Sequence, residues 1–268
     1  MNRNNFKTIL LGSSQLNSSK SGSRSYRIFL KLEKFNHLPQ WFAFAWATVY
    51  LAIILAIVKG IFPSSIPFTY FELWHTTGNL SDWCTTSWPI LAWAIGLTFL
   101  VSILTRNSDE ENIYAEYLLR NGFWVSLRAG LMEEILFRWL LLMLWIPMVK
   151  VINFIFLGFI DLGLIEIIHL HIIAPIANFF TMDILKEQVG NPNNWSLGAA
   201  IIIANSKFRD GHKYLGLIGF VNSWFIGMFM FYLLFKYGLV AAIVVHFLYD
   251  LFIYLVRYLD SIFERSRT

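Results

Sequence analysis

The sequence contains few cysteines and few charged residues. Cys84 is the only cysteine among 268 residues, which excludes an intrachain disulfide framework and a zinc knuckle built from cysteines. Charged residues make up 14% of the chain, whereas soluble domains contain about 25%. With 57% hydrophobic residues and a mean hydropathy of +0.56, the composition excludes an ordinary soluble domain and favours a membrane protein.

Several familiar functional signatures are also missing from the sequence. The net charge of +4 is modest, and the sequence contains no stripe of basic residues of the kind that binds nucleic acid. The chain contains no HExxH, no GxSxG and no phosphate-binding loop. We find no internal repeat, which argues against a transporter built from symmetric halves.

Long apolar stretches predict helices that cross a bilayer, which takes about 20 residues each. The clearest stretches are residues 41–62, 86–105, 123–149, 216–235 and 239–258. Residues 151–180 are apolar but interrupted by polar residues and Pro175, which predicts two short or broken helices. Residues 196–204 lead into a short helix with a polar end at 205–214. The sequence therefore predicts an all-α bundle of seven or eight transmembrane helices within residues 41–258.

The two ends of the chain differ from this apolar region. No acidic residue precedes Glu33, and the first forty residues are basic and rich in serine. We interpret residues 1–40 as a tail with an interfacial segment, with a transit peptide as the alternative. Residues 259–268 are interpreted as a C-terminal tail.

The distribution of Lys and Arg predicts the orientation of the chain. Seven basic residues occur through Lys34, none lies between residues 62 and 88, and the C-terminus contains Arg257, Arg265 and Arg267. The positive-inside rule then predicts that both termini are cytoplasmic. This arrangement requires an even number of crossings and favours eight over seven.

Residues 130–145, GLMEEILFRWLLLMLW, place three ionisable side chains inside an apolar helix. Each charge at the centre of a membrane helix costs roughly 2.5–3.5 kcal/mol, so these side chains need partners or a polar cavity. Glu134 and Arg138 are four residues apart in the order that favours an ion pair. Glu133 has no cation three or four residues away and is therefore a candidate general base.

Two later segments supply partners for this carboxylate. ANSKFRDGHKY places Phe208 and His212 four residues apart, and VAAIVVHFLYDLFIYL places His246 and Asp250 four residues apart. A carboxylate within a membrane helix already indicates function. We expect Glu133, Glu134, His212, His246 and Asp250 to converge on one cavity.

Three motifs in this order resemble a known family. EEILFR fits EExxxR, FRDGH fits FxxxH, and HFLYD fits HxxxN/D. Together they resemble the CPBP family of CAAX-protease and bacteriocin-processing membrane proteins, also called Abi. Its archetype is the type II CAAX prenyl endopeptidase, a glutamate intramembrane protease. The resemblance covers about residues 123–258.

The resemblance implies a role for each matching residue. Glu133 would activate a water for attack on a peptide carbonyl, with His212 as its partner in proton handling. His246 and Asp250 would lie where the family stabilises the oxyanion. Glu134, Arg138 and Phe208 would support the site.

The sequence departs from the family pattern in two places. The interval between the first two motifs is longer than usual, so residues 151–195 resemble an insertion. Asp250 stands where the archetype has Asn, and an ionised Asp cannot donate a hydrogen bond to an oxyanion.

Three functions remain open at this stage. The first is a membrane-embedded endopeptidase that needs no cofactor. The second is a zinc metalloprotease, because the same Glu, His and Asp residues are plausible zinc ligands. The third is a non-catalytic scaffold or immunity-type protein. Suitable partners, besides the bilayer, are a prenylated C-terminus, a bacteriocin leader or a membrane-protein segment.

Overall fold

The computed structural model describes residues 37–63, 66–105, 109–156, 164–180, 183, 185–189 and 195–265. Residues 1–36, which contain most of the predicted basic tail and the candidate transit peptide, lie outside the described residues. The described residues form helices and turns with no β-strand. The predicted all-α architecture is therefore confirmed.

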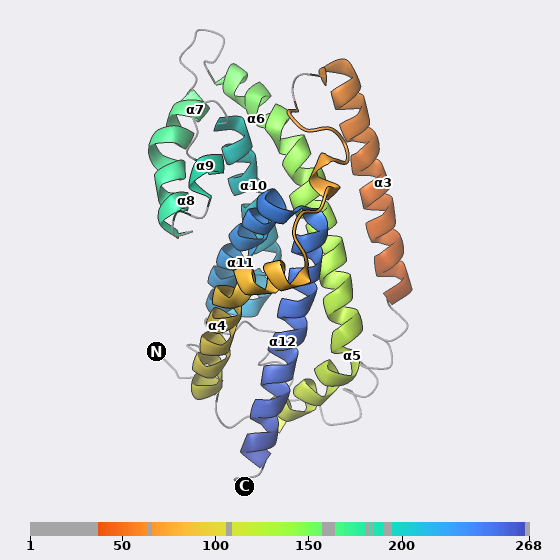
Figure 1. The fold of residues 1–268 in the computed structure, drawn as a ribbon, viewed down its shortest axis with the longest axis vertical. Helices are drawn as coiled ribbons and strands as arrows, with labels where there is room; N and C mark the ends of the chain where they lie inside the picture. The colour runs from red at the N-terminus through yellow and green to blue at the C-terminus, as the bar shows by residue number, and fades with distance from the viewer. Residues whose placement is uncertain are drawn as a thin grey trace.

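Four long helices and one longer continuous helical run form the bundle, arranged as Figure 1 shows. The four are α3 (His37–Ile61), α4 (Leu80–Thr105), α11 (Gly216–Tyr237) and α12 (Leu239–Arg265). The continuous run consists of α5 (Asp109–Glu133), the π-helical segment η5 (Glu134–Leu141) and α6 (Leu142–Ile155). Residues 259–265, predicted as part of the C-terminal tail, continue α12.

Shorter elements connect α6 to α11 along the chain. They are α7 (Leu164–Ile168), η7 (His169–Ile173), α8 (Ala174–Phe180), α9 (Lys186–Val189) and α10 (Trp195–Gly211). Two 3-10 turns, η4 (Glu72–Trp74) and η9 (Lys213–Leu215), lie in the connections before α4 and α11.

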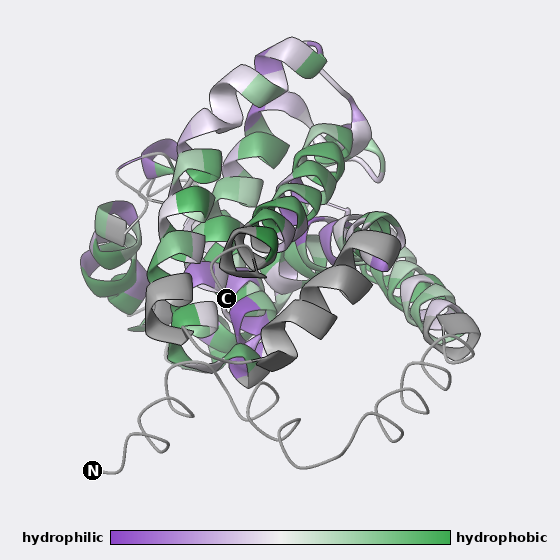
Figure 2. Cartoon of the chain, turned by 90° about the horizontal axis from the view of Figure 1, so that it is seen from below, coloured by the Kyte–Doolittle hydropathy of each residue, from purple (hydrophilic) through white to green (hydrophobic). Residues whose placement is uncertain are grey.

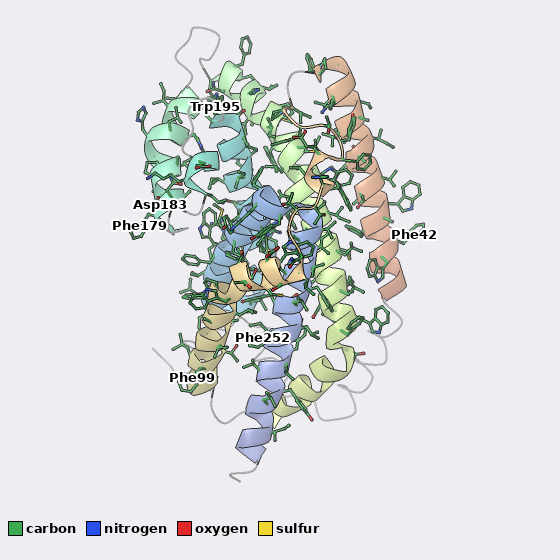
Figure 3. All side chains as sticks on the ribbon, viewed as in Figure 1. Phe42, Phe99, Phe179, Asp183, Trp195 and Phe252 are labelled. Carbon is green, nitrogen blue, oxygen red and sulfur yellow. The ribbon has the colours of Figure 1, made fainter. Side chains whose placement is uncertain are left out.

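Five of the described helices are long and apolar enough to cross a membrane. These spans are Trp41–Ile61, Leu80–Leu100, Asn121–Ile155, Gly216–Tyr237 and Leu239–Val256. Large apolar side chains on them face outward; Phe42 and Phe99 are 67% and 68% exposed and project from the bundle (Figure 3). Hydrophobic residues also dominate these helices when they are seen from below (Figure 2). These features fit a multi-pass membrane protein.

The predicted seven or eight spans are not confirmed, and the difference lies between α6 and α11. Residues 196–214, predicted as two pieces, form the single 17-residue helix α10 and the turn after it. Most of the α10 side chains are buried, including Leu197, Ala200 and Ile201. Its small residues allow neighbouring helices to surround it, so α10 is an internal helix of the bundle.

The segment between α3 and α4 runs along the bundle and packs on η5 and on the turn between α11 and α12 (Figure 1). The indole Nε1 of Trp139 donates to the carbonyl of Tyr70 at 2.8 Å, and the rings of Trp74 and Trp139 meet edge to face. The Thr77 amide donates to the carbonyl of Tyr237 at 3.1 Å. Gly238, with φ +94°, makes the tight turn from α11 to α12 beneath this segment.

Helices α5 and α12 approach each other closely and run antiparallel. A Cβ added at Gly130 would lie 3.0 Å from the carbonyl oxygen of Ile243 and 3.1 Å from the amide of Phe247. Only glycine permits this backbone separation. The contact lies one turn from Glu134 and brings that residue opposite His246.

Candidate active site

The first two site residues lie at a change in helix type. Glu133 ends α5 and Glu134 begins η5, whose residues follow the wider π-helical pattern. π-Helical segments are rare in proteins, and those that occur often lie at functional sites. The helix is continuous through this change, so both carboxylates are carried on a rigid element.

Glu134 and Arg138 form the predicted ion pair in the interior. Arg138 Nε lies 3.2 Å from Glu134 Oε2, and both side chains are fully buried. The Arg138 guanidinium also donates to the carbonyl of Gly227 at 3.4 Å. Its centre lies 4.0 Å from the centroid of the Phe208 ring, a cation–π distance. The buried charge therefore has an anion, a carbonyl and an aromatic face around it.

Glu134 also holds His246 on α12. The Nδ1 of His246 lies 2.6 Å from Glu134 Oε1, the length of a strong charge-assisted hydrogen bond. Because the carboxylate accepts, Nδ1 is the protonated nitrogen that donates. This bond directs Nε2 of His246 toward Glu133 Oε2 at 3.8 Å and Asp250 Oδ2 at 3.7 Å.

His212, which directly follows α10, is also oriented by a hydrogen bond at its Nδ1. Its Nδ1 lies 2.8 Å from the carbonyl of Phe208, which can only accept, so Nδ1 donates here too. The Nε2 of His212 then faces Glu133 Oε1 at 3.9 Å. The ring centroids of Phe208 and His212 lie 4.6 Å apart. Phe208 therefore contacts both the buried cation and the exposed side of the site.

The five side chains lie close together, because Glu133 is near His212 and His246, and His246 is also near Glu134 and Asp250. Glu133 lies between two imidazoles from different helices, at distances longer than a hydrogen bond and suited to one bridging oxygen atom. Exposure of the side chains falls from Glu133 (28%) and Asp250 (22%) to His246 (5%) and Glu134 (0%). The site thus has an accessible layer, which also contains His212, in front of a buried supporting layer.

One feature of the site was not anticipated from the sequence. Asn205 is buried and its Nδ2 donates to the carbonyl of Trp224 at 3.0 Å, joining α10 to α11. A Cβ at Gly227 would overlap Asn205 Oδ1 and lie 2.9 Å from Phe208. Gly227 therefore leaves room for α10 to lie against α11 at this level. Nothing in the local sequence of Asn205 indicated its partner.

Metal ligation is not indicated by the geometry of the described residues. Within the described ranges, no group of three or more His, Cys, Asp or Glu side chains is arranged to hold a metal ion. The zinc alternative therefore depends on the residue types at Glu133, His212, His246 and Asp250 and on the orientation of the two histidines.

No family model, no curated protein and no solved structure matches this chain. The resemblance to the CPBP family consequently depends on the three motifs alone, with the side-chain geometry as its physical context.

Proposed function

We propose that this protein is a membrane-embedded endopeptidase of the CPBP type, in which Glu133 acts as the general base. The observation that carries the proposal is the position of the Glu133 carboxylate, 3.9 Å from Nε2 of His212 and 3.8 Å from Nε2 of His246. A water bound between these groups would be held by a base and oriented by a second acceptor. The expected substrate is a peptide presented at the membrane, such as a prenylated C-terminal segment.

The proposed reaction is hydrolysis of one peptide bond. Glu133 removes a proton from the water, and the resulting hydroxide oxygen attacks the carbonyl carbon. The tetrahedral intermediate collapses by breaking the C–N bond. The proton held on Glu133 or His212 is then transferred to the departing nitrogen. The products are a carboxylate and an amine, and no oxidant or reductant is needed.

The buried layer supports this role by restricting His246. The bond from Nδ1 to Glu134 fixes the ring, and Arg138 neutralises the charge of Glu134. Groups that are fixed before the reaction need little reorganisation during it, which is the main source of electrostatic catalysis. His246 and Asp250 are our candidates for stabilising the oxyanion. For His246 this role requires the imidazolium, in which Nε2 donates while Nδ1 remains bonded to Glu134. For Asp250 this role requires the protonated form, because only that form donates.

A zinc metalloprotease is the second candidate, and one observation favours it. Both histidines use Nδ1 to donate to a fixed acceptor and direct Nε2 toward the same carboxylate. Zinc-binding histidines are commonly oriented in this way by their second nitrogen. Zinc would polarise the carbonyl and lower the pKa of bound water when present. In that case Glu133, His212 and His246 would be the residues that hold it.

The chain path supports a proposed orientation. We propose that both termini are cytoplasmic, as the distribution of Lys and Arg predicts. The contacts Thr86–Tyr237 and Trp93–Asn222 make α4 antiparallel to α11. Helix α5 is antiparallel to α12, and α10 and α11 form a further hairpin. Counting α10 as a buried return of the chain gives six passages, an even number.

The experiment that tests the proposal is a peptidase assay on the purified full chain in proteoliposomes. The substrates are a fluorogenic peptide with a farnesylated C-terminal CAAX sequence and its unprenylated counterpart. Glu133→Gln should abolish cleavage while leaving thermal stability nearly unchanged, because the amide keeps the shape of the side chain. Glu72→Gln, which changes an exposed carboxylate before α4, is the matched control and should be fully active.

Three results would separate the alternatives. Cleavage by wild type that survives Glu133→Gln would remove the general-base assignment. Failure of the wild type to cleave either peptide, or a library of membrane-protein segments, would favour the scaffold function. Loss of activity on adding a chelator, restored by zinc, would favour the metalloprotease.

A further inference from the structure

A cluster of cations lies where α10 ends and the chain turns into α11. Lys207, Arg209 and Lys213 occur within seven residues, together with a single carboxylate, Asp210. We call these four residues the basic turn. Lys207 is exposed and the side chain of Lys213 is 64% exposed, so both ammonium groups are accessible. His212 of the proposed active site lies in the same segment, between Asp210 and Lys213.

The single carboxylate of the basic turn is already paired with two cations. Arg209 donates to Asp210 Oδ1 from Nε at 3.2 Å and from Nη2 at 2.8 Å, and Lys213 Nζ lies 3.4 Å from Asp210 Oδ2. The pKa of Asp210 is lowered from its ordinary value, chiefly by the hydrogen bond from Arg209. Asp210 is therefore ionised at neutral pH. Three cations against one carboxylate leave the basic turn with a net positive charge.

The position of the basic turn along the bundle can be derived from α4. Trp93 on α4 donates to Asn222 on α11 at 2.8 Å, so these residues lie at the same level. The span in α4 ends seven residues later at Leu100, and α11 begins six residues earlier at Gly216. A helix rises about 1.5 Å per residue, so Leu100 lies about 10 Å and Gly216 about 9 Å from the level of the Trp93–Asn222 contact. Both displacements are in the same direction because α4 and α11 are antiparallel. The basic turn is thus at the end of the apolar spans.

The surroundings of Arg209 are those of a membrane interface. Its guanidinium lies 4.4 Å from the ring centroid of Phe220 and 5.5 Å from that of Trp224, both on α11. Leu217 and Val221 on the same helix are 51% and 43% exposed. A cation resting on aromatic rings beside exposed apolar residues suits the boundary between acyl chains and headgroups.

From this charge and position we propose that the basic turn binds the phosphate of an anionic phospholipid. The exposed ammonium groups of Lys207 and Lys213 contact the phosphate, while Arg209 remains on its aromatic support. Occupancy fixes the turn that carries His212, and so the lipid composition of the membrane regulates the geometry around Glu133. The binding step does not depend on the proposed peptidase function, because it can be measured without any substrate.

The test is a lipid titration of the purified full chain in detergent, followed by native mass spectrometry. Phosphatidylglycerol and phosphatidylcholine are compared on the wild type and on Lys207→Gln, Lys213→Gln and the double variant. We expect phosphatidylglycerol to bind more tightly. Each lysine substitution should weaken it about fivefold, the equivalent of about 1 kcal/mol per basic residue near a charged membrane surface.

Lys236→Gln is the matched control for charge. Lys236 is an exposed lysine at the opposite end of α11, with its Nζ donating to Tyr232 at 2.9 Å. This variant should bind phosphatidylglycerol as the wild type does. Equal affinity for both lipids, or equal weakening by Lys236→Gln, would overturn the proposal. Tighter binding of an acidic peptide that displaces the lipid would overturn it as well, and would assign the basic turn to a peptide partner.

Discussion

His246 on α12 and Glu134 at the start of η5 are joined by a 2.6 Å contact, although 112 residues separate them in the chain. Glu134 in turn contacts Arg138, so one buried carboxylate links an imidazole of α12 to a guanidinium of η5. An ion pair of this kind is costly to bury and costly to break. Its position behind the more exposed Glu133 suggests that its main effect is on the geometry of the site.

The first prediction concerns the buried cation. Arg138→Ala should lower the free energy of unfolding by roughly 3–5 kcal/mol, because it leaves Glu134 as an unpaired charge in the interior. The matched control is Arg209→Ala, whose ion pair with Asp210 is partly exposed. In that variant the free energy of unfolding should fall by about 1 kcal/mol or less. Unfolding by SDS titration in mixed micelles measures both, and equal losses would show that Arg138 is not buried in solution.

A second prediction tests the close approach of α5 and α12. Gly130→Ala should destabilise the protein by about 1–3 kcal/mol, because its Cβ would meet the backbone of α12, which cannot move aside locally. Gly96→Ala on α4 is the control, since an added Cβ there has no neighbour within 4 Å. It should leave thermal stability unchanged or raise it slightly, as alanine favours the helix. A Gly130→Ala variant as stable as the wild type would contradict the observed helix separation.

The third prediction concerns the aromatic ring that covers Arg138. Phe208→Leu keeps much of the apolar volume but removes the ring face 4.0 Å from the guanidinium, and should cost about 2 kcal/mol. Phe220→Leu removes the ring 4.4 Å from the partly exposed Arg209. Phe220→Leu should lower the free energy of unfolding by only about 0.5–1 kcal/mol, because water also solvates Arg209. Chemical denaturation of the two variants side by side gives the comparison, and a larger loss for Phe220→Leu would reverse our ranking.

Local spacing explains what the sequence could predict about the site. Glu134 and Arg138 lie four residues apart on one helix, so their pairing follows from helix geometry and needs no tertiary information. The intramembrane positions of His246 and Asp250 likewise marked them as candidates, because charge in an apolar helix is costly. These arguments depend only on residues within one turn of each other.

The contact between His246 and Glu134 could not be predicted in the same way. It depends on the closeness of α5 and α12 at Gly130, and a single glycine in an apolar helix does not identify its neighbour. The resemblance to the CPBP family implies an oxyanion role for His246, but neither it nor the local sequence indicates that Glu134 accepts a hydrogen bond from His246 Nδ1.

The prediction of seven or eight spans is not confirmed by the described residues, five of whose helices are long and apolar enough to cross a membrane. Hydropathy alone does not distinguish a lipid-facing helix from one buried within the protein, and α10 is of the second kind. Its alanine and glycine residues favour close packing among other helices. The polar residues at its end were interpreted as a separate short element, whereas they extend the same helix to Gly211.

The last prediction uses Asp250 to separate the glutamate protease from the metalloenzyme. Asn donates a hydrogen bond at every pH, whereas Asp donates only when protonated. If Asp250 stabilises the oxyanion, Asp250→Asn should retain activity at neutral pH and gain relative activity at alkaline pH. If Asp250 is a metal ligand, the neutral amide weakens coordination, so activity and bound zinc should fall together. A pH–rate profile of both proteins, with metal content measured on the same samples, gives opposite signs for the two mechanisms. Chelator treatment of the wild type is the control, because a mechanism that uses only Glu133 and His212 is indifferent to it. An inactive Asp250→Asn that recovers on addition of zinc would defeat the glutamate mechanism and establish the metalloprotease.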